Sequence, residues 1–159
     1  MGKSLANLIF KGEESELAMT ENAQPSILAT SVAIIAALKE SGKIDKHSFH
    51  CVAGHSLGEY SALVANKSLN FSDSVELLKI RSKAMQESMP VGTGGMAAII
   101  GGTEEEIATT ISDISPEGKV FIANDNAVGQ LVISGEMKAI DYIVENSKKL
   151  GLKKVIKLS

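Results

Sequence analysis

The chain has 159 residues, of which 44% are hydrophobic and 22% charged, a composition typical of a folded globular protein and not of a disordered one. Its formal net charge is -3 and its basic residues are spread along the chain, so we expect no nucleic-acid partner. No apolar run reaches the roughly 18 residues of a membrane span, and the N-terminus lacks the form of a signal peptide; we therefore expect no membrane association and a cytoplasmic location.

The first part of the chain predicts helices before a short strand. Residues 1–22 are polar and weakly patterned, which indicates a short helix and a loop. A longer helix is predicted to begin at Pro25, since a proline costs least in the first helical turn, and to end at Ser41-Gly42. We expect this helix to pack on a sheet through its apolar face, which consists of Ile27, Leu28, Ser31, Ile34, Ile35 and Leu38.

A β-compatible segment, His50–Ala53, runs into the sequence GHSLG over residues 54–58. The pattern G-x-S-x-G is that of a nucleophile elbow, in which a serine occupies a sharp, strained turn between a strand and a helix. The two glycines are expected to leave space where Cβ atoms would collide. Ser56 is therefore the candidate nucleophile. The backbone N–H of Leu57, at the start of the next helix, is a candidate donor to an oxyanion.

Other reactive side chains near this motif are given no catalytic role. Cys51 is the only cysteine and lies in the predicted strand, which favours a small buried hydrophobe over a reactive thiol. His47 and His50 flank the strand and are interpreted as surface or strand-edge residues. His55 adjoins Ser56, and neighbouring side chains diverge as they leave a tight turn, so we interpret it as a packing residue.

A long helix is predicted next, with Ser72 as its N-cap and Pro90 and Gly92 at its end. Arg81 lies within this helix. A helical arginine often belongs to a solvated face. Its planar guanidinium also suits bidentate recognition of a substrate carboxylate, and periodicity alone leaves both interpretations open.

The remainder of the chain predicts the element order β-α-β-β-α-β, which is typical of a ferredoxin-like arrangement. The first helix of this part begins with a capping box, Thr103 to Glu106. We therefore divide the chain into residues 1–92, an α/β part that carries the elbow, and residues 93–159, a small α+β part. The predicted elements of the second part are strand 96–100, helix 104–113, strands 119–123 and 130–134, helix 136–150 and strand 153–158.

The segment GHSLGEYSAL, residues 54–63, resembles the signature of the malonyl-CoA:acyl carrier protein transacylases, the acyltransferases of fatty acid synthesis. The resemblance extends from about Gln24 to the end of the chain and includes Arg81 and the stretches 92–99 and 124–130. It implies an α/β fold: part of an α/β-hydrolase-like acyltransferase subdomain with the nucleophile elbow, plus a ferredoxin-like (βαββαβ) α+β subdomain.

The resemblance also implies a chemistry. In the family, the serine that matches Ser56 attacks the malonyl thioester and forms an acyl-enzyme, and the thiol of acyl carrier protein then takes the malonyl group. The arginine that matches Arg81 holds the malonyl carboxylate. Malonyl-CoA is thus the expected substrate and acyl carrier protein the expected partner. We expect no bound cofactor and no metal, because the sequence has no cluster with metal-ligand spacing and no dinucleotide fingerprint.

Two parts of the family's catalytic machinery have no match in the sequence: a Gly-Gln-Gly-rich turn that supports the oxyanion hole, and the general-base histidine, which lies a few residues beyond Ser159. We therefore expect the sequence to represent the middle of an enzyme. Two alternatives stay open at this point. One is a serine esterase or thioesterase that uses the same elbow, and the other is an inactive fragment or a binding module.

Overall fold

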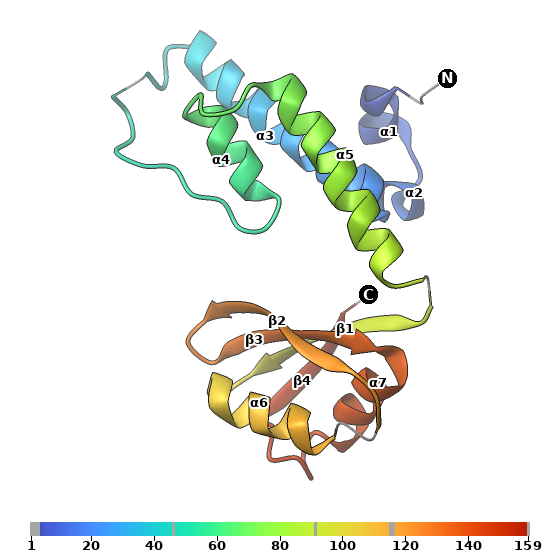
Figure 1. Cartoon of the computed structure of the whole chain (residues 1–159). Coiled ribbons are helices and arrows are strands. Elements are labelled where there is room, and N and C mark those ends of the chain that lie inside the picture. Colours follow the sequence, from blue (N-terminus) through green and yellow to red (C-terminus); the bar gives the residue numbers. More distant parts are fainter. Residues whose placement is uncertain (1–3, 46, 91, 115–116, 159) are drawn as a thin grey trace. The chain divides into compact units, whose positions relative to one another are not determined.

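The computed structural model describes residues 4–45, 47–90, 92–114 and 117–158, which belong to two compact units, Met1–Ser88 and Met89–Ser159 (Figure 1). The domain boundary expected from the sequence lies a few residues further along, after residue 92. In the first unit the regular elements formed by the described residues are all helices. They are α1 (Leu5–Lys11), α2 (Glu14–Ala18), α3 (Thr20–Glu40), α4 (Gly58–Ala65) and α5 (Phe71–Ser88).

Helices α3 and α5 pack closely against one another in the first unit, and α4 packs against α3 (Figure 1). The buried residues of α5 are Ser74, Leu78 and Ser82, which are spaced four residues apart and so share one face of the helix. Their two serine hydroxyls donate to carbonyls of the preceding turn, so they are satisfied within the helix. Small side chains on both sides of Leu78 allow α3 to approach closely, and Leu28 of α3 is fully buried as well.

Two helices begin earlier than the sequence predicted. Helix α3 begins at Thr20, and Pro25 lies inside it, although a proline there leaves the helix without one backbone hydrogen bond. Helix α5 begins at Phe71, and its cap is Asn70, not Ser72: Asn70 Oδ1 accepts a hydrogen bond from the N–H of Asp73 at 2.8 Å. Asparagine caps a helix as well as serine does, so local preference did not separate the two positions.

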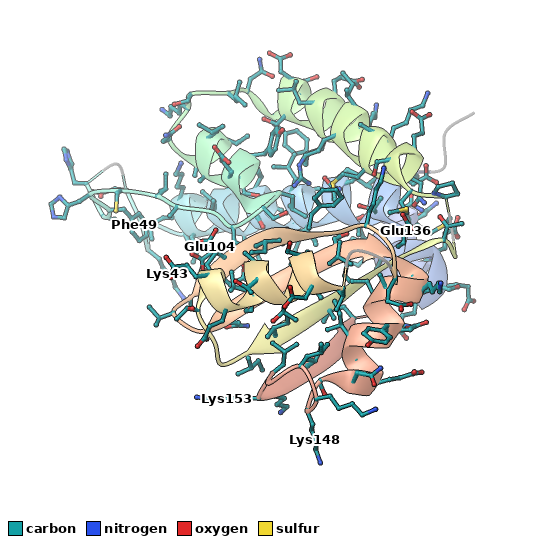
Figure 2. The ribbon with its side chains drawn as sticks, turned by 60° about the horizontal axis from the view of Figure 1, so that its bottom comes forward. Lys43, Phe49, Glu104, Glu136, Lys148 and Lys153 are labelled. Atoms are coloured by element: carbon teal, nitrogen blue, oxygen red, sulfur yellow. The ribbon has the colours of Figure 1, made fainter. Side chains whose placement is uncertain are left out.

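The strand expected at His50–Ala53 is absent. Residues 51–54 adopt no regular secondary structure and are exposed. A strand is stabilised by hydrogen bonds to a neighbouring strand, and the described residues of this unit include none for it to pair with. Phe49, which Figure 2 labels, is therefore 59% exposed, and Val52 is 40% exposed. Both line an open pocket of about 1030 Å³ beside the end of α3.

The apolar face predicted for the long helix of the first unit is also partly wrong. Leu28 is fully buried, whereas Ile27 is 49% and Ile34 is 55% exposed. The expectation that this helix packs on a sheet is wrong: α3 packs on helices, because no strand is formed among the described residues of this unit. Ser31, Ile35 and Leu38 of the predicted face are half-buried, so this face is partly covered by the neighbouring helices.

The second unit has the predicted element order, β-α-β-β-α-β. Its four strands form one antiparallel sheet in the order β2-β3-β1-β4, and both helices lie on the same face of it (Figure 1). The elements are β1 (Gly94–Ile100), α6 (Glu104–Asp113), β2 (Val120–Ala127), β3 (Gln130–Glu136), α7 (Met137–Asn146) and β4 (Lys154–Leu158). Strand β2 is longer than the predicted 119–123, and α7 is shorter than the predicted 136–150, since it ends at Asn146.

The main hydrophobic core lies between the sheet and the helices of the second unit. Alternate residues of β1 and β3 face the helices, and the buried cluster that results contains Ala97, Ile99, Ile107, Ile114, Val120, Leu131, Ile133, Ala139, Ile140, Ile143 and Leu152. The predicted capping box of α6 is confirmed: Thr103 Oγ1 accepts from the Glu106 N–H, and the Glu106 carboxylate accepts from the Thr103 N–H. In the first unit, the buried apolar residues among those described are Leu8, Leu28 and Leu78.

Candidate functional site

The sharp turn expected at Ser56 is present. Ser56 has a φ of 54°, in the left-handed region, and helix α4 begins two residues later at Gly58. Such a conformation costs a residue other than glycine roughly 1–3 kcal/mol, so the surrounding structure must hold it. The turn is closed by hydrogen bonds from the Gly58 N–H to the His55 carbonyl at 2.8 Å and from the Glu59 N–H to the Ser56 carbonyl at 3.2 Å. Ser56 is exposed at this turn.

The two glycines of the motif differ in what they do. A Cβ added at Gly54 would lie 1.9 Å from the carbonyl oxygen of Gly58 and 2.5 Å from the nitrogen of Glu59, so only glycine allows the chain to pass there. A Cβ added at Gly58 would meet no atom within 4 Å. The expectation that both glycines avoid a collision is therefore wrong for Gly58.

Alanine substitutions at the two glycines should have opposite effects. We expect Gly54→Ala to force the turn open and to abolish any reactivity of Ser56, because the clash is with backbone and cannot be relieved by a rotamer change. Gly58→Ala should leave the turn intact and stabilise the start of α4 by up to about 1 kcal/mol, since alanine favours a helix. Thermal unfolding and the reactivity of Ser56 toward a serine-directed phosphonate would measure both effects. A reactive Gly54→Ala protein would contradict this account of the elbow.

The Leu57 N–H lies where an oxyanion donor is expected. Leu57 precedes the first residue of α4, and its own φ and ψ are already helical at -61° and -23°. In the described part of the chain, no hydrogen bond is donated by this N–H to another backbone group. Donors at a helix N-terminus favour negative charge, so this group could stabilise an oxyanion formed next to Ser56.

Arg81 of α5 reaches the elbow. Its Nη2 donates a hydrogen bond to Ser56 Oγ at 3.0 Å, and its Nη1 donates to Gln24 Oε1 at 2.6 Å. Its side chain is half-buried, so the interpretation of Arg81 as part of a solvated face does not hold. The fold thus brings together residues that are 25 and 57 positions apart in the sequence.

Gln24 is the site residue that sequence reasoning missed. It is 3% exposed on α3, and its Nε2 donates to Thr20 Oγ1 at 2.7 Å and to Met85 Sδ at 3.3 Å. One signal could have found it: Gln24 lies one helical turn before Leu28, so a polar side chain occupies a buried position of the helix. A buried amide needs hydrogen-bond partners, and such partners often belong to a site.

The segment before the elbow differs from expectation in its burial. Cys51 is exposed, not buried, and His55 is exposed as well, which contradicts its interpretation as a packing residue. Both corrections follow from the unformed strand, because the described residues of this unit form no neighbouring strand that could cover this segment. Earlier in this segment, hydrogen bonds from the His47 N–H and the Ser48 hydroxyl lower the pKa of the Asp45 carboxyl.

The described residues contain no group of three or more His, Cys, Asp or Glu side chains placed to hold a metal ion. None of the helices that they form combines the length and the apolarity needed to cross a bilayer.

The chain was compared with known protein families and with curated proteins. The family described as "Acyl transferase domain" matches residues 1–159. The malonyl CoA-acyl carrier protein transacylase of Bacillus subtilis (strain 168) is 44% identical over 155 residues, which are 97% of this chain and 48% of that protein. The protein of the same name from Staphylococcus aureus (strain COL) is 40% identical over 152 residues, which are 95% of this chain and 47% of that protein.

Solved structures give the same pattern of similarity. An acyl-carrier-protein-S-malonyltransferase from Bartonella henselae matches with a TM-score of 0.86 and 43% identity, over 97% of this chain and 49% of that one. A malonyl-transacylase solved in complex with its type II polyketide synthase acyl-carrier protein matches with a TM-score of 0.86 and 39% identity, over 98% and 49%. The chain thus spans about half the length of the curated relatives it matches.

Proposed function

The chain belongs to the acyl transferase domain family, and on that basis we propose that it takes part in transferring malonyl groups from coenzyme A to acyl carrier protein in fatty acid biosynthesis. The observation that carries this proposal is the hydrogen bond from the Arg81 guanidinium to Ser56 Oγ at 3.0 Å. It places a permanent positive charge beside the candidate nucleophile, where an acyl group that ends in a carboxylate can be recognised.

The proposed reaction has two half-reactions at Ser56. First, Ser56 Oγ attacks the thioester carbonyl of malonyl-CoA; the carbonyl oxygen takes up negative charge next to the Leu57 N–H, and coenzyme A leaves as its thiol. Second, the phosphopantetheine thiol of acyl carrier protein attacks the resulting ester, and Ser56 regains its proton as the malonyl group departs. Both steps need a group that accepts and returns the hydroxyl proton, and a guanidinium cannot do so.

The spacing of the site supports malonyl as the acyl group. In a malonyl thioester, one methylene separates the carboxylate from the carbonyl that is attacked. A cation that holds the carboxylate must therefore lie within a few ångströms of the nucleophile, as Arg81 does. A simple esterase has no use for a cation in this position, so the contact between Arg81 and Ser56 argues against that alternative.

We also propose a finer description of the fold. The helical first unit, with the elbow, would be part of an α/β-hydrolase-like subdomain within residues 1–92, and the second unit a ferredoxin-like subdomain within residues 93–159. The sheet order β2-β3-β1-β4 and the TM-scores of 0.86 support this description. The cytoplasmic location stays a prediction from the sequence.

The 159-residue chain by itself should be a poor transacylase. The hydrogen bond that Ser56 Oγ accepts comes from Arg81, which cannot act as a base, and general-base assistance typically contributes about 10²–10⁴-fold. Lack of a second oxyanion donor would cost roughly a further 10²–10³-fold. By contrast, a chimera in which these 159 residues replace the matching segment of the Bacillus subtilis relative, called here the completed chain, should transfer malonyl at about 1–10³ per second.

Malonyl transfer from coenzyme A to acyl carrier protein, measured for the chain and for the completed chain, tests this prediction. Enzyme-like turnover by the chain itself would show that a base lies within these residues, and His47, His50 and His55 would then be replaced one at a time. A completed chain that unfolds cooperatively and yet transfers no malonyl would contradict the proposed function.

A further inference from the structure

Gln24 has the contacts of a residue that holds another side chain in place. The residue is 3% exposed, and burial of an amide is costly unless its polar atoms are paired. Here the oxygen accepts from Arg81 Nη1 at 2.6 Å, while the nitrogen donates to Thr20 Oγ1 and to Met85 Sδ. The buried amide thus pairs on one side with the arginine and on the other with groups that fix its own orientation.

Arg81 decides which way the amide faces, and Thr20 holds the amide in that orientation. The Thr20 hydroxyl accepts the amide N–H at 2.7 Å, across one helical turn. If the amide were rotated by half a turn, its NH₂ group would face the guanidinium, which has donors only, and two donors would meet. This contact also accounts for the early start of α3, since the turn from Thr20 to Gln24 precedes Pro25 and carries the pair.

We propose that Gln24 is a positioning residue for Arg81: it holds the guanidinium by Nη1 so that Nη2 lies on Ser56 Oγ and the remaining N–H donors face the carboxylate of the acyl group. The effect on the reaction rests on the proposed malonyl transfer, whereas the orientation of Arg81 by Gln24 can be measured by itself. A guanidinium that is already oriented loses less freedom when the carboxylate binds, and a displacement of about 1 Å at such a site can cost roughly 10²-fold in rate.

The composition of the chain allows the orientation of the Arg81 guanidinium to be measured directly. Arg81 is the only arginine among the 16 lysine and arginine residues, so the chain labelled with ¹⁵N-arginine gives signals from a single guanidinium. With Gln24 in place, we expect separate, exchange-protected Nη signals, because the group is held at two of its nitrogens. Gln24→Leu keeps a side chain of similar volume but removes the hydrogen-bond acceptor. In this variant the Nη signals should merge into one averaged signal.

Further variants separate a positioning role of Gln24 from a general loss of structure. Gln24→Glu keeps an acceptor at Nη1, so the separate signals should persist, but its added carboxylate competes with that of malonyl. Thr20→Val should broaden the signals, while Thr30→Val, whose hydroxyl donates to the Ser26 carbonyl on the same helix, should leave them unchanged. Gln86→Leu, which changes a half-buried glutamine of α5, is the matched control for Gln24→Leu.

The consequence for the reaction is measured with the completed chain as kcat/KM for malonyl-CoA and for acetyl-CoA. Gln24→Leu should lower the malonyl value by roughly 10–100-fold and the acetyl value by less than about 3-fold, because only malonyl uses the oriented guanidinium. Gln24→Glu should lower the malonyl value although Arg81 remains ordered. A loss that affected both acyl groups equally would indicate a structural role only.

Failure of this inference differs from failure of the proposed function. If Gln24→Leu leaves the Arg81 signals separate, or leaves the ratio of malonyl to acetyl transfer unchanged in an active completed chain, the inference is overturned and the proposed function stands. If the completed chain transfers no malonyl but Gln24→Leu still releases Arg81, the proposed function fails and the positioning of Arg81 stands. Thr20→Val gives a second test should Gln24→Leu unfold.

Discussion

Replacement of Ser56 by alanine should reduce malonyl transfer by the completed chain to the uncatalysed level. Ser56 would be the group that carries the acyl chain between the two half-reactions, so its loss removes the intermediate itself. In a serine hydrolase, removal of the nucleophile costs about 10⁶-fold in kcat. The backbone of the elbow should tolerate the change, because alanine at a φ of 54° is strained to a similar degree as serine. Transfer is measured with labelled malonyl-CoA and acyl carrier protein.

Ser61 provides the matched control for this substitution. It lies on α4, one helical turn beyond the elbow, and its buried hydroxyl has no hydrogen-bond partner among the described residues. Ser61→Ala should therefore leave transfer unchanged and raise the melting temperature slightly, since it removes an unsatisfied buried polar group. Residual transfer by Ser56→Ala at more than about one part in 10³ of the unsubstituted rate would mean that another residue is the nucleophile.

Replacement of Arg81 by alanine should affect malonyl transfer far more than acetyl transfer. Each charge-assisted hydrogen bond to a carboxylate contributes about 1.5–3 kcal/mol. Loss of a two-bond contact should therefore lower kcat/KM for malonyl-CoA by roughly 10²–10⁴-fold. Acetyl-CoA lacks the carboxylate, so its value should fall by less than about 10-fold, through the lost hydrogen bond to Ser56. The two values are measured side by side on the completed chain.

Two variants on α5 serve as controls for the charge. Lys83→Ala removes an exposed cation that pairs with Glu87, so it changes the net charge as Arg81→Ala does but should leave both acyl groups unaffected. Arg81→Lys keeps the charge but loses the planar fork, and its malonyl rate should lie between those of the unsubstituted enzyme and Arg81→Ala. Equal losses of malonyl and acetyl transfer in Arg81→Ala would assign Arg81 a structural role only.

The second unit was predictable because its signals are local. The capping box at Thr103 starts α6 as expected, and alternate residues of β1 and β3 supply the apolar side chains of the face that packs on the helices. The differences are at the ends of elements. Strand β2 continues through Asn124 to Ala127, because pairing with β3 outweighs the turn preference of its asparagines.

The first unit was harder to predict because its missing features depend on distant partners. The apolar sequence of His50–Ala53 suits a strand, yet a strand forms only where another strand offers hydrogen bonds. The exposure of Cys51 and of Val52 follows from the same cause. Hydrophobic pattern gives the side of a helix or strand that prefers burial; it does not state whether a partner is present to cover it.

The residues of the candidate site also differ in how far they could be predicted: local patterns were found and distant contacts were missed. Ser56 follows from a local pattern, and the glycine that the turn needs, Gly54, is part of that pattern. Arg81 was identified through the resemblance, and its contact with Ser56 spans 25 positions. Gln24 was missed because its hydrogen bond to Arg81 spans 57 positions. The presence of a single arginine in a lysine-rich chain is a composition signal that could have singled out Arg81.

The most direct test of the central claim is to locate the malonyl group on the protein. The completed chain is mixed with malonyl-CoA in the absence of acyl carrier protein, quenched in acid and digested, and the peptide from His47 to Lys67 is fragmented in a mass spectrometer. This peptide contains four serine and cysteine residues, Ser48, Cys51, Ser56 and Ser61, so fragmentation must place the added mass on one of them. We predict a single malonyl group on Ser56; a malonyl group on Ser48, Cys51 or Ser61, or on a residue outside this peptide, with Ser56 unmodified, would contradict the account.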